Sequence, residues 1–95
     1  MKKQFTITQE QPFRPLMVIP GVGKSIALDL LNIGITCPDD LKGRDPQVLY
    51  DQSNRCAGMV QDRCLLYCFR CAVYYAETTG GDLDPELLKW WNWKD

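Results

Sequence analysis

The sequence predicts an all-α domain of five to six helices, and three observations support this prediction. Apolar residues recur at helical spacing in the long segments, glycines and prolines separate these segments, and no stretch beyond residues 5–7 alternates as a strand does. The chain has 95 residues, which is enough for one domain with its own core. Its 45% of hydrophobic and 24% of charged residues are typical of a globular protein and argue against disorder.

The chain is predicted to form a single domain behind a flexible arm. Residues 1–12 are polar and lack a helix cap, so we expect an N-terminal arm without fixed structure. No linker divides residues 13–95, which we therefore expect to fold together. The helices predicted within them are residues 13–19, 25–32, 38–42, 46–53 and 59–78, followed by a C-terminal Trp-rich helix over residues 85–93.

Local signals predict where these helices begin and end. Gly34 stands where a C-terminal cap belongs. Asp45 and Asp84 each precede a proline, which is the pattern of an N-cap followed by proline at the first helical position. Thr36 is the predicted N-cap of the third helix, with Asp39 in a favourable position against the helix dipole.

The helix over residues 59–78 is predicted to be central and buried, because apolar residues occur nearly all round it. Three of the five cysteines lie on one stripe of this helix: Cys64, Cys68 and Cys71. Residues on one helical face do not bridge one another easily, so we interpret these cysteines as reduced core thiols. A zinc site would need a fourth ligand, such as Cys37 or Cys56, and whether the cysteines bind metal stays open. A Cys-based redox protein is a less favoured alternative, because the C-x-x-C spacing of Cys68 and Cys71 lies in mid-helix and not at a helix start.

Charge and composition exclude several classes of function. The net charge of −1 provides no global basic field, so any contact with nucleic acid must be local. The apolar runs are too short for a membrane span and no signal peptide occurs, so we expect a cytoplasmic protein with no membrane partner. The chain contains no histidine, which excludes imidazole base chemistry. We expect no catalytic residue and no organic cofactor.

The segment around Pro20 carries the main functional signal. Gly23-Lys24-Ser25 spells the end of a P-loop, but Val18 stands where that motif needs a glycine, and the chain offers no sheet to hold it. The segment instead predicts a hairpin between two helices, because it contains, in order, an apolar residue, a break, Gly-apolar-Gly and a polar helix start. Its backbone amides lie at a helix N-terminus, where the dipole favours an anion.

We expect this hairpin to bind DNA phosphate weakly and without sequence preference. The predicted phosphate-binding residues are Gly21, Val22, Gly23, Lys24, Ser25, Arg55, Arg63 and Arg70. Arg55 belongs to a degenerate second hairpin with one glycine, Gly58, and Arg63 and Arg70 share a face of the long helix. A turn used only for packing, in a protein-interaction module, remains the alternative. The tryptophans at positions 90, 91 and 93 either stack on unpaired bases or cap the core.

Three blocks of sequence carry a resemblance to a known family. In order, they are Ile19-Pro20-Gly21-Val22-Gly23, Leu41-Lys42-Gly43-Arg44-Asp45-Pro46, and Gln61-Asp62-Arg63-Cys64 with residues 69–76. Together they resemble the small bacterial "pathogenicity locus" family, some members of which are labelled mitomycin resistance protein. The resemblance spans residues 16–77 and leaves the Trp-rich tail outside.

The resemblance implies a tandem helix-hairpin-helix (SAM-like) fold, association with DNA, and a link to DNA repair or damage resistance, but no reaction. By resemblance to hairpins of this class, a monovalent cation would be held by the backbone carbonyls of Met17, Ile19 and Val22. DNA is the expected partner. A protein partner or a second copy of the chain stays open.

Overall fold

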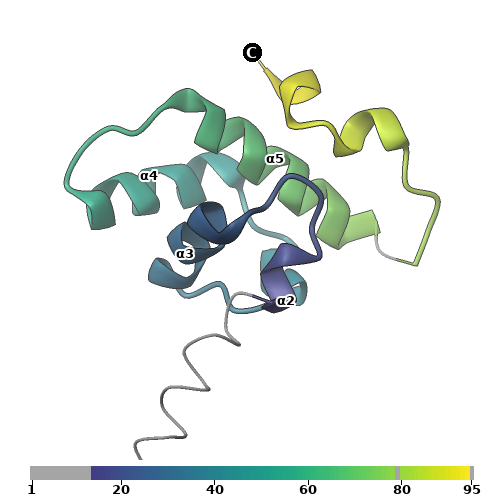
Figure 1. Cartoon of the computed structure of the whole chain (residues 1–95), viewed down its shortest axis with the longest axis horizontal. Helices are drawn as coiled ribbons and strands as arrows, with labels where there is room; N and C mark the ends of the chain where they lie inside the picture. Colours follow the sequence, from purple (N-terminus) through teal and green to yellow (C-terminus); the bar gives the residue numbers. More distant parts are fainter. Residues whose placement is uncertain (1–13, 79, 95) are drawn as a thin grey trace, which may run out of the picture.

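The computed structural model describes residues 14–78 and 80–94, and over these residues the chain is all-helical and contains no strand (Figure 1). The elements, with η denoting 3-10 helices, are α2 (Arg14–Met17), α3 (Lys24–Asn32), η2 (Pro38–Leu41), α4 (Pro46–Ala57), α5 (Arg63–Thr78), η3 (Pro85–Leu88) and η4 (Trp90–Trp93). The prediction of an all-α protein is confirmed for this part of the chain. The predicted arm over residues 1–12 lies outside the described residues.

Helix α5 is the central element, as its apolar circumference predicted. Its buried residues are Leu65, Leu66, Cys68, Phe69, Cys71, Ala72, Val73 and Ala76. In Figure 1, α4 runs beside α5, α2 and α3 lie below them, and the yellow C-terminal segment lies along the upper side of α5. Side chains from α2, α3, η2 and α4 join those of α5 in one hydrophobic core. The helices surround this core, and the loops that connect them lie at its periphery.

The boundary between α4 and α5 differs from the prediction. Helix α4 continues to Ala57, through part of the predicted turn, and α5 begins at Arg63 and not at residue 59. Gly58 ends α4 in the left-handed conformation, with φ of 72°. The amides of Gly58 and Met59 donate to carbonyls in the last turn of α4, at 3.2 Å each, which is a Schellman cap. The helical spacing of apolar residues therefore continued across a real break.

The other glycine and aspartate caps are confirmed. Gly34, with φ of 90°, donates to the Leu31 carbonyl at 3.1 Å beyond the end of α3. Asp45 accepts a 2.9 Å hydrogen bond from the amide two residues later at the start of α4. Asp84 accepts one of 3.0 Å at the start of η3. In each case the signal and the structure it specifies lie within a few residues of one another.

Three other helix predictions were wrong. The N-cap of η2 is Cys37, and Thr36 instead donates both its amide and its hydroxyl to Asp40 Oδ2, at 3.0 and 2.9 Å. Helix α2 ends at Met17, before the predicted residue 19, because the chain turns where the Ile19 amide bonds back to the Leu16 carbonyl at 3.1 Å. The predicted C-terminal helix is two separate 3-10 turns, η3 and η4.

Candidate functional site

The loop between α2 and α3, residues 18–23, is here named the first loop. Its path depends on Gly21, which has φ of 84°, and on a 3.0 Å hydrogen bond from the Val22 amide to the Ile19 carbonyl. Ile19 and Val22 are both buried in the core. The apolar side chains thus anchor the loop, while Gly21 and Gly23 lie exposed at its surface.

The start of α3 is open to solvent. Gly23 is its N-cap, with an extended backbone at φ of −93° and ψ of −171°, and no side chain of the described residues caps this turn. No heavy atom of the described residues other than its chain neighbours lies within 4 Å of where a Cβ at Gly23 would stand. Lys24 and Ser25 are exposed, and the first turn contains no acidic residue. First-turn amides have no intrahelical carbonyl to bind, so this turn is suited to an anion.

The remaining members of the predicted hairpin site have different roles. The Val22 amide is used inside the loop, so Val22 contributes a buried anchor and not an outward-facing donor. The Ile19 carbonyl accepts that bond and keeps a second lone pair. A monovalent cation at the carbonyls of Met17, Ile19 and Val22 stays a prediction.

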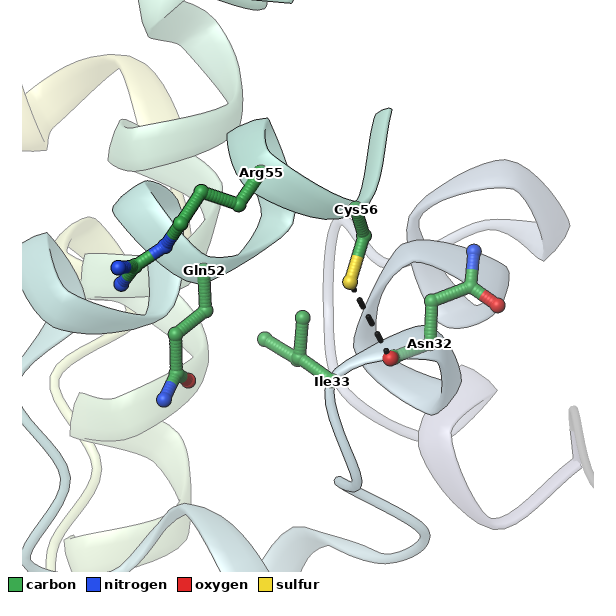
Figure 2. A pocket seen from close by; sticks show the side chains of 5 residues that line it. All are labelled: Asn32, Ile33, Gln52, Arg55 and Cys56. Atoms are coloured by element: carbon green, nitrogen blue, oxygen red, sulfur yellow. Dashed lines mark hydrogen bonds between the residues drawn. The ribbon is translucent and has the colours of Figure 1, made fainter. Parts of the chain in front are cut away.

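Arg55 lies at the opposite end of α3 from the first loop. It lines a pocket of about 410 Å³ with Gln52 and Cys56 of α4 and with Asn32 and Ile33 at the end of α3 (Figure 2). The Cys56 thiol donates to the Asn32 carbonyl at 3.5 Å. A nine-residue helix is about 13 Å long, so the structure does not bring Arg55 to the first loop.

Arg63 and Arg70 lie on the same face of α5, and both guanidinium groups lie near the Tyr67 ring. Their guanidinium carbons are 5.9 and 5.6 Å from the ring centroid, which is within the range of a cation–π interaction. Arg70 also donates to the Trp93 carbonyl at 2.7 Å. Arg70 therefore attaches the C-terminal segment to α5, whereas Arg63 is exposed at the helix start.

The tryptophan segment, residues 90–93, lies next to the first loop. The sequence analysis did not predict this proximity. A Cβ at Gly21 would lie 3.8 Å from Cδ1 of Trp90. Trp91 meets Trp90 edge to face, with ring centroids 5.7 Å apart, and remains 50% exposed. Lys94 Nζ is 5.9 Å from the centroid of the Trp90 ring. No local pattern signals this proximity, because it arises from the packing of η4 on α5.

The cysteines of α5 differ in their environments. Cys68 and Cys71 are buried, and burial raises the pKa of each thiol to about 11, so both are protonated at neutral pH. A hydrogen bond with Asp62 raises the pKa of Cys64. Within residues 14–78 and 80–94, no three His, Cys, Asp or Glu residues come close enough together to hold a metal ion. The burial of Cys68 and Cys71 agrees with their interpretation as core thiols.

Over the described residues, fold and site together define an all-helical domain in which a helix start without a capping side chain lies beside an exposed aromatic segment. The chain belongs to the pathogenicity locus family, because the family model of that description matches residues 9–95. The match extends beyond the resemblance seen in the sequence and includes the tryptophan segment. The comparisons matched no curated protein and no solved structure. Among the described helices, none has the length and apolar character needed to cross a membrane.

Proposed function

We propose that this protein is a DNA-binding module without sequence preference, and that the start of α3 binds a phosphate of the DNA backbone. The observation that carries the proposal is the absence of a capping side chain at Gly23 among the described residues. Three other helix starts, in contrast, are capped by the carboxylates of Asp45, Asp62 and Asp84. A helix start without a capping side chain among the described residues, with a lysine next to it, favours an external anion.

In this proposal the chain is a tandem helix-hairpin-helix (SAM-like) domain. The first unit is α2, the first loop and α3, and the second is α4, residues 58–62 and α5. The two helices of each unit pack against one another, and η2 lies in the connection between the units. Both loops contain a left-handed glycine, Gly21 in one and Gly58 in the other. These common features support the assignment of two related units.

The proposed roles follow from position. Gly21 shapes the loop, Gly23 admits the phosphate, and Ser25 provides an amide and a hydroxyl. Lys24 adds a cation, and Arg63 adds a second one at the start of α5. With so few cations, a log–log plot of affinity against salt should have a slope of about −1 to −2, since each neutralised phosphate contributes ~0.9. The cation at the Met17, Ile19 and Val22 carbonyls belongs to the same proposal.

The test is salt-titrated binding of a labelled duplex by the wild type and by Gly23→Asp. The backbone angles at Gly23 suit any residue and the space beside it is open, so this variant should fold. Its carboxylate would cap α3 as Asp62 caps α5. The expected loss is about tenfold or more at low salt, because a charge-assisted hydrogen bond is removed and an anion is added.

The matched control is Val48→Asp, which adds the same charge at a residue of α4 that is 47% exposed and lies outside the first loop and residues 58–62. We expect this control to bind within about threefold of the wild type, since its charge is screened and lies on a helix that has no part in the proposed phosphate site. Equal losses in both variants, or no binding by the wild type at low salt, would contradict the proposal.

A protein-interaction module is the second candidate, and a specific observation favours it. Met59 and Val60 are adjacent in the loop between α4 and α5 and are 64% and 79% exposed. Two neighbouring exposed apolar side chains on a loop are suited to a partner protein or a second copy of the chain. Sedimentation of the wild type and of a Met59→Ser, Val60→Ser double variant tests the second copy, since self-association should be lost in the variant.

A further inference from the structure

We infer that the DNA bound by this protein carries unpaired bases next to the bound phosphate, and that Trp91 stacks on one of them. The inference rests on the proposed function, because the first loop must hold the backbone of the same DNA. It adds the class of DNA structure: a single-stranded overhang, gap or end beside the point of attachment.

The tryptophan segment lies close to the first loop. Trp90 lies against the exposed face of Gly21, at 3.8 Å from the position of a Cβ there. Trp91 is in contact with Trp90, edge to face. A phosphate held at the start of α3 is therefore close to an aromatic surface, and the nucleotides that follow it along the strand come within reach of Trp91.

The tryptophan segment is held in place before any ligand binds. The Trp93 carbonyl accepts from Arg70 at 2.7 Å, and the Trp93 indole N–H donates to the Leu87 carbonyl at 2.8 Å. The Asn92 side-chain amide donates to the Glu86 carbonyl at 2.6 Å. An aromatic side chain on a segment fixed in this way loses little conformational entropy when it binds a base.

Trp91 is more exposed than the two neighbouring tryptophans. Trp90 and Trp93 are half-buried and are used within the fold, against Gly21 and against Tyr74 respectively. Trp91 is half exposed. The exposed half of this indole contributes little to folding, but it is suited to stacking on an unpaired base, since every base has a π-face.

Positively charged side chains lie next to the tryptophan segment. Lys94 lies over the Trp90 ring, and Arg70 donates to the Trp93 carbonyl, so the tryptophan segment has one cation at Trp90 and another at Trp93. The Glu86 carboxylate is paired with Lys89 at 3.0 Å. Aromatic rings with interspersed cations are the combination that binds single-stranded nucleic acid.

The geometry of DNA determines which kind of DNA could reach Trp91 with a base face. In a duplex the bases are stacked inside, so an indole beside the sugar-phosphate backbone meets no base face. Base faces next to a bound phosphate are available only where the strand is unpaired. The position of Trp91 beside a backbone-binding loop therefore favours a junction between double- and single-stranded DNA over continuous duplex.

The experiment compares a blunt duplex with the same duplex extended by a short single-stranded overhang, by fluorescence anisotropy at low salt. The wild type should bind the overhang DNA about tenfold more tightly. Trp91→Ala should remove this preference and leave blunt-duplex binding unchanged, and Trp91→Phe should retain most of it. Met59→Ala, a 64% exposed apolar residue elsewhere, is the control and should leave both affinities unchanged.

The outcomes separate this inference from the proposed function. Equal binding of blunt and overhang DNA by the wild type overturns the inference and leaves the proposed function standing. An overhang preference that survives in Trp91→Ala also overturns the inference. No binding of either DNA overturns the proposed function and the inference with it. Quenching of tryptophan fluorescence by the overhang, lost in Trp91→Ala, supports direct stacking.

Discussion

Two interhelical loops of this protein each contain a left-handed glycine but differ at the helix start that follows them. The first loop contains the left-handed Gly21 and ends at Gly23, which places no side chain over the start of α3. The second loop, residues 58–62, contains the left-handed Gly58 and ends at Asp62. Asp62 Oδ1 accepts a 2.8 Å hydrogen bond from the Cys64 amide. One helix start thus has no capping side chain among the described residues, and the other is capped by a carboxylate of the chain itself.

The loops also differ in what holds them in place. In the first loop Val22 is 6% exposed and packs in the core, whereas Val60 of the second loop is 79% exposed. The second loop is held by polar groups of α4 through Gln61. Its amide donates to Asn54 Oδ1 at 2.9 Å and its side chain to Ser53 Oγ at 3.0 Å. Burial of apolar side chains is the main anchor of the first loop, which we call the open loop. Side-chain hydrogen bonds are the main anchor of the second loop, which we call the closed loop.

The largest expected effect comes from exchanging the two valines for alanine. Val22→Ala should lower the free energy of unfolding by about 2 kcal/mol, because it deletes buried methyl groups and leaves a cavity. Val60→Ala should change it by less than about 0.5 kcal/mol, since this side chain is in solvent. Urea unfolding of both variants measures the difference. Equal losses would contradict the assignment of different anchors to the two loops.

A smaller effect is expected from exchanging the helix caps. Gly23→Asp should raise the free energy of unfolding by about 0.5 kcal/mol, because aspartate caps a helix better than glycine does. Asp62→Gly should lower it, because the Cys64 amide loses its acceptor. Thermal unfolding of both variants measures the two signs. Gly23→Ala is the control: if it stabilises as much as Gly23→Asp, the gain comes from the unfolded chain and not from the cap.

Most features specified by near neighbours in the sequence were predictable, although the Thr36 cap, which is also local, was predicted wrongly. Gly34, Asp45 and Asp84 were each identified as helix caps, and each acts as one. The chemistry of such a cap needs only a left-handed glycine or a carboxylate within two residues of its amide. The Gly21–Gly23 turn belongs to the same class, because its glycines and its buried valine lie within a few residues of one another.

Features set by tertiary packing were not predictable. Met59 and Val60 continued the apolar spacing of α5, so the sequence predicted a helix start there, although both side chains are exposed beyond the cap at Gly58. The contact between Trp90 and Gly21 has no local signal either, because residues far apart in the chain meet through their packing around α5. The sequence therefore predicted the Gly21–Gly23 turn and left the aromatic surface beside it undetected.

The smallest expected effect concerns pH and tests the carboxylate of the closed loop. The hydrogen bond from the Cys64 amide lowers the pKa of Asp62 below its ordinary value of 3.8. A carboxylate whose pKa is lower in the folded state stabilises the fold above the unfolded value, and this contribution is lost as pH falls through the folded value. Asp62→Asn keeps a neutral acceptor at every pH. The stability of the wild type relative to Asp62→Asn should therefore fall as the pH is lowered below 3.8.

Urea unfolding of both proteins between neutral and strongly acidic pH measures this difference directly. The other carboxylates with lowered pKa values, Asp40 and Glu86, are common to both proteins and cancel in the comparison. Val22→Ala is the control from the open loop. That loop contains no carboxylate, so the stability difference between the wild type and Val22→Ala should stay constant over the same pH range. A wild-type advantage over Asp62→Asn that is also constant would show that the Asp62 carboxylate does not cap α5 in solution.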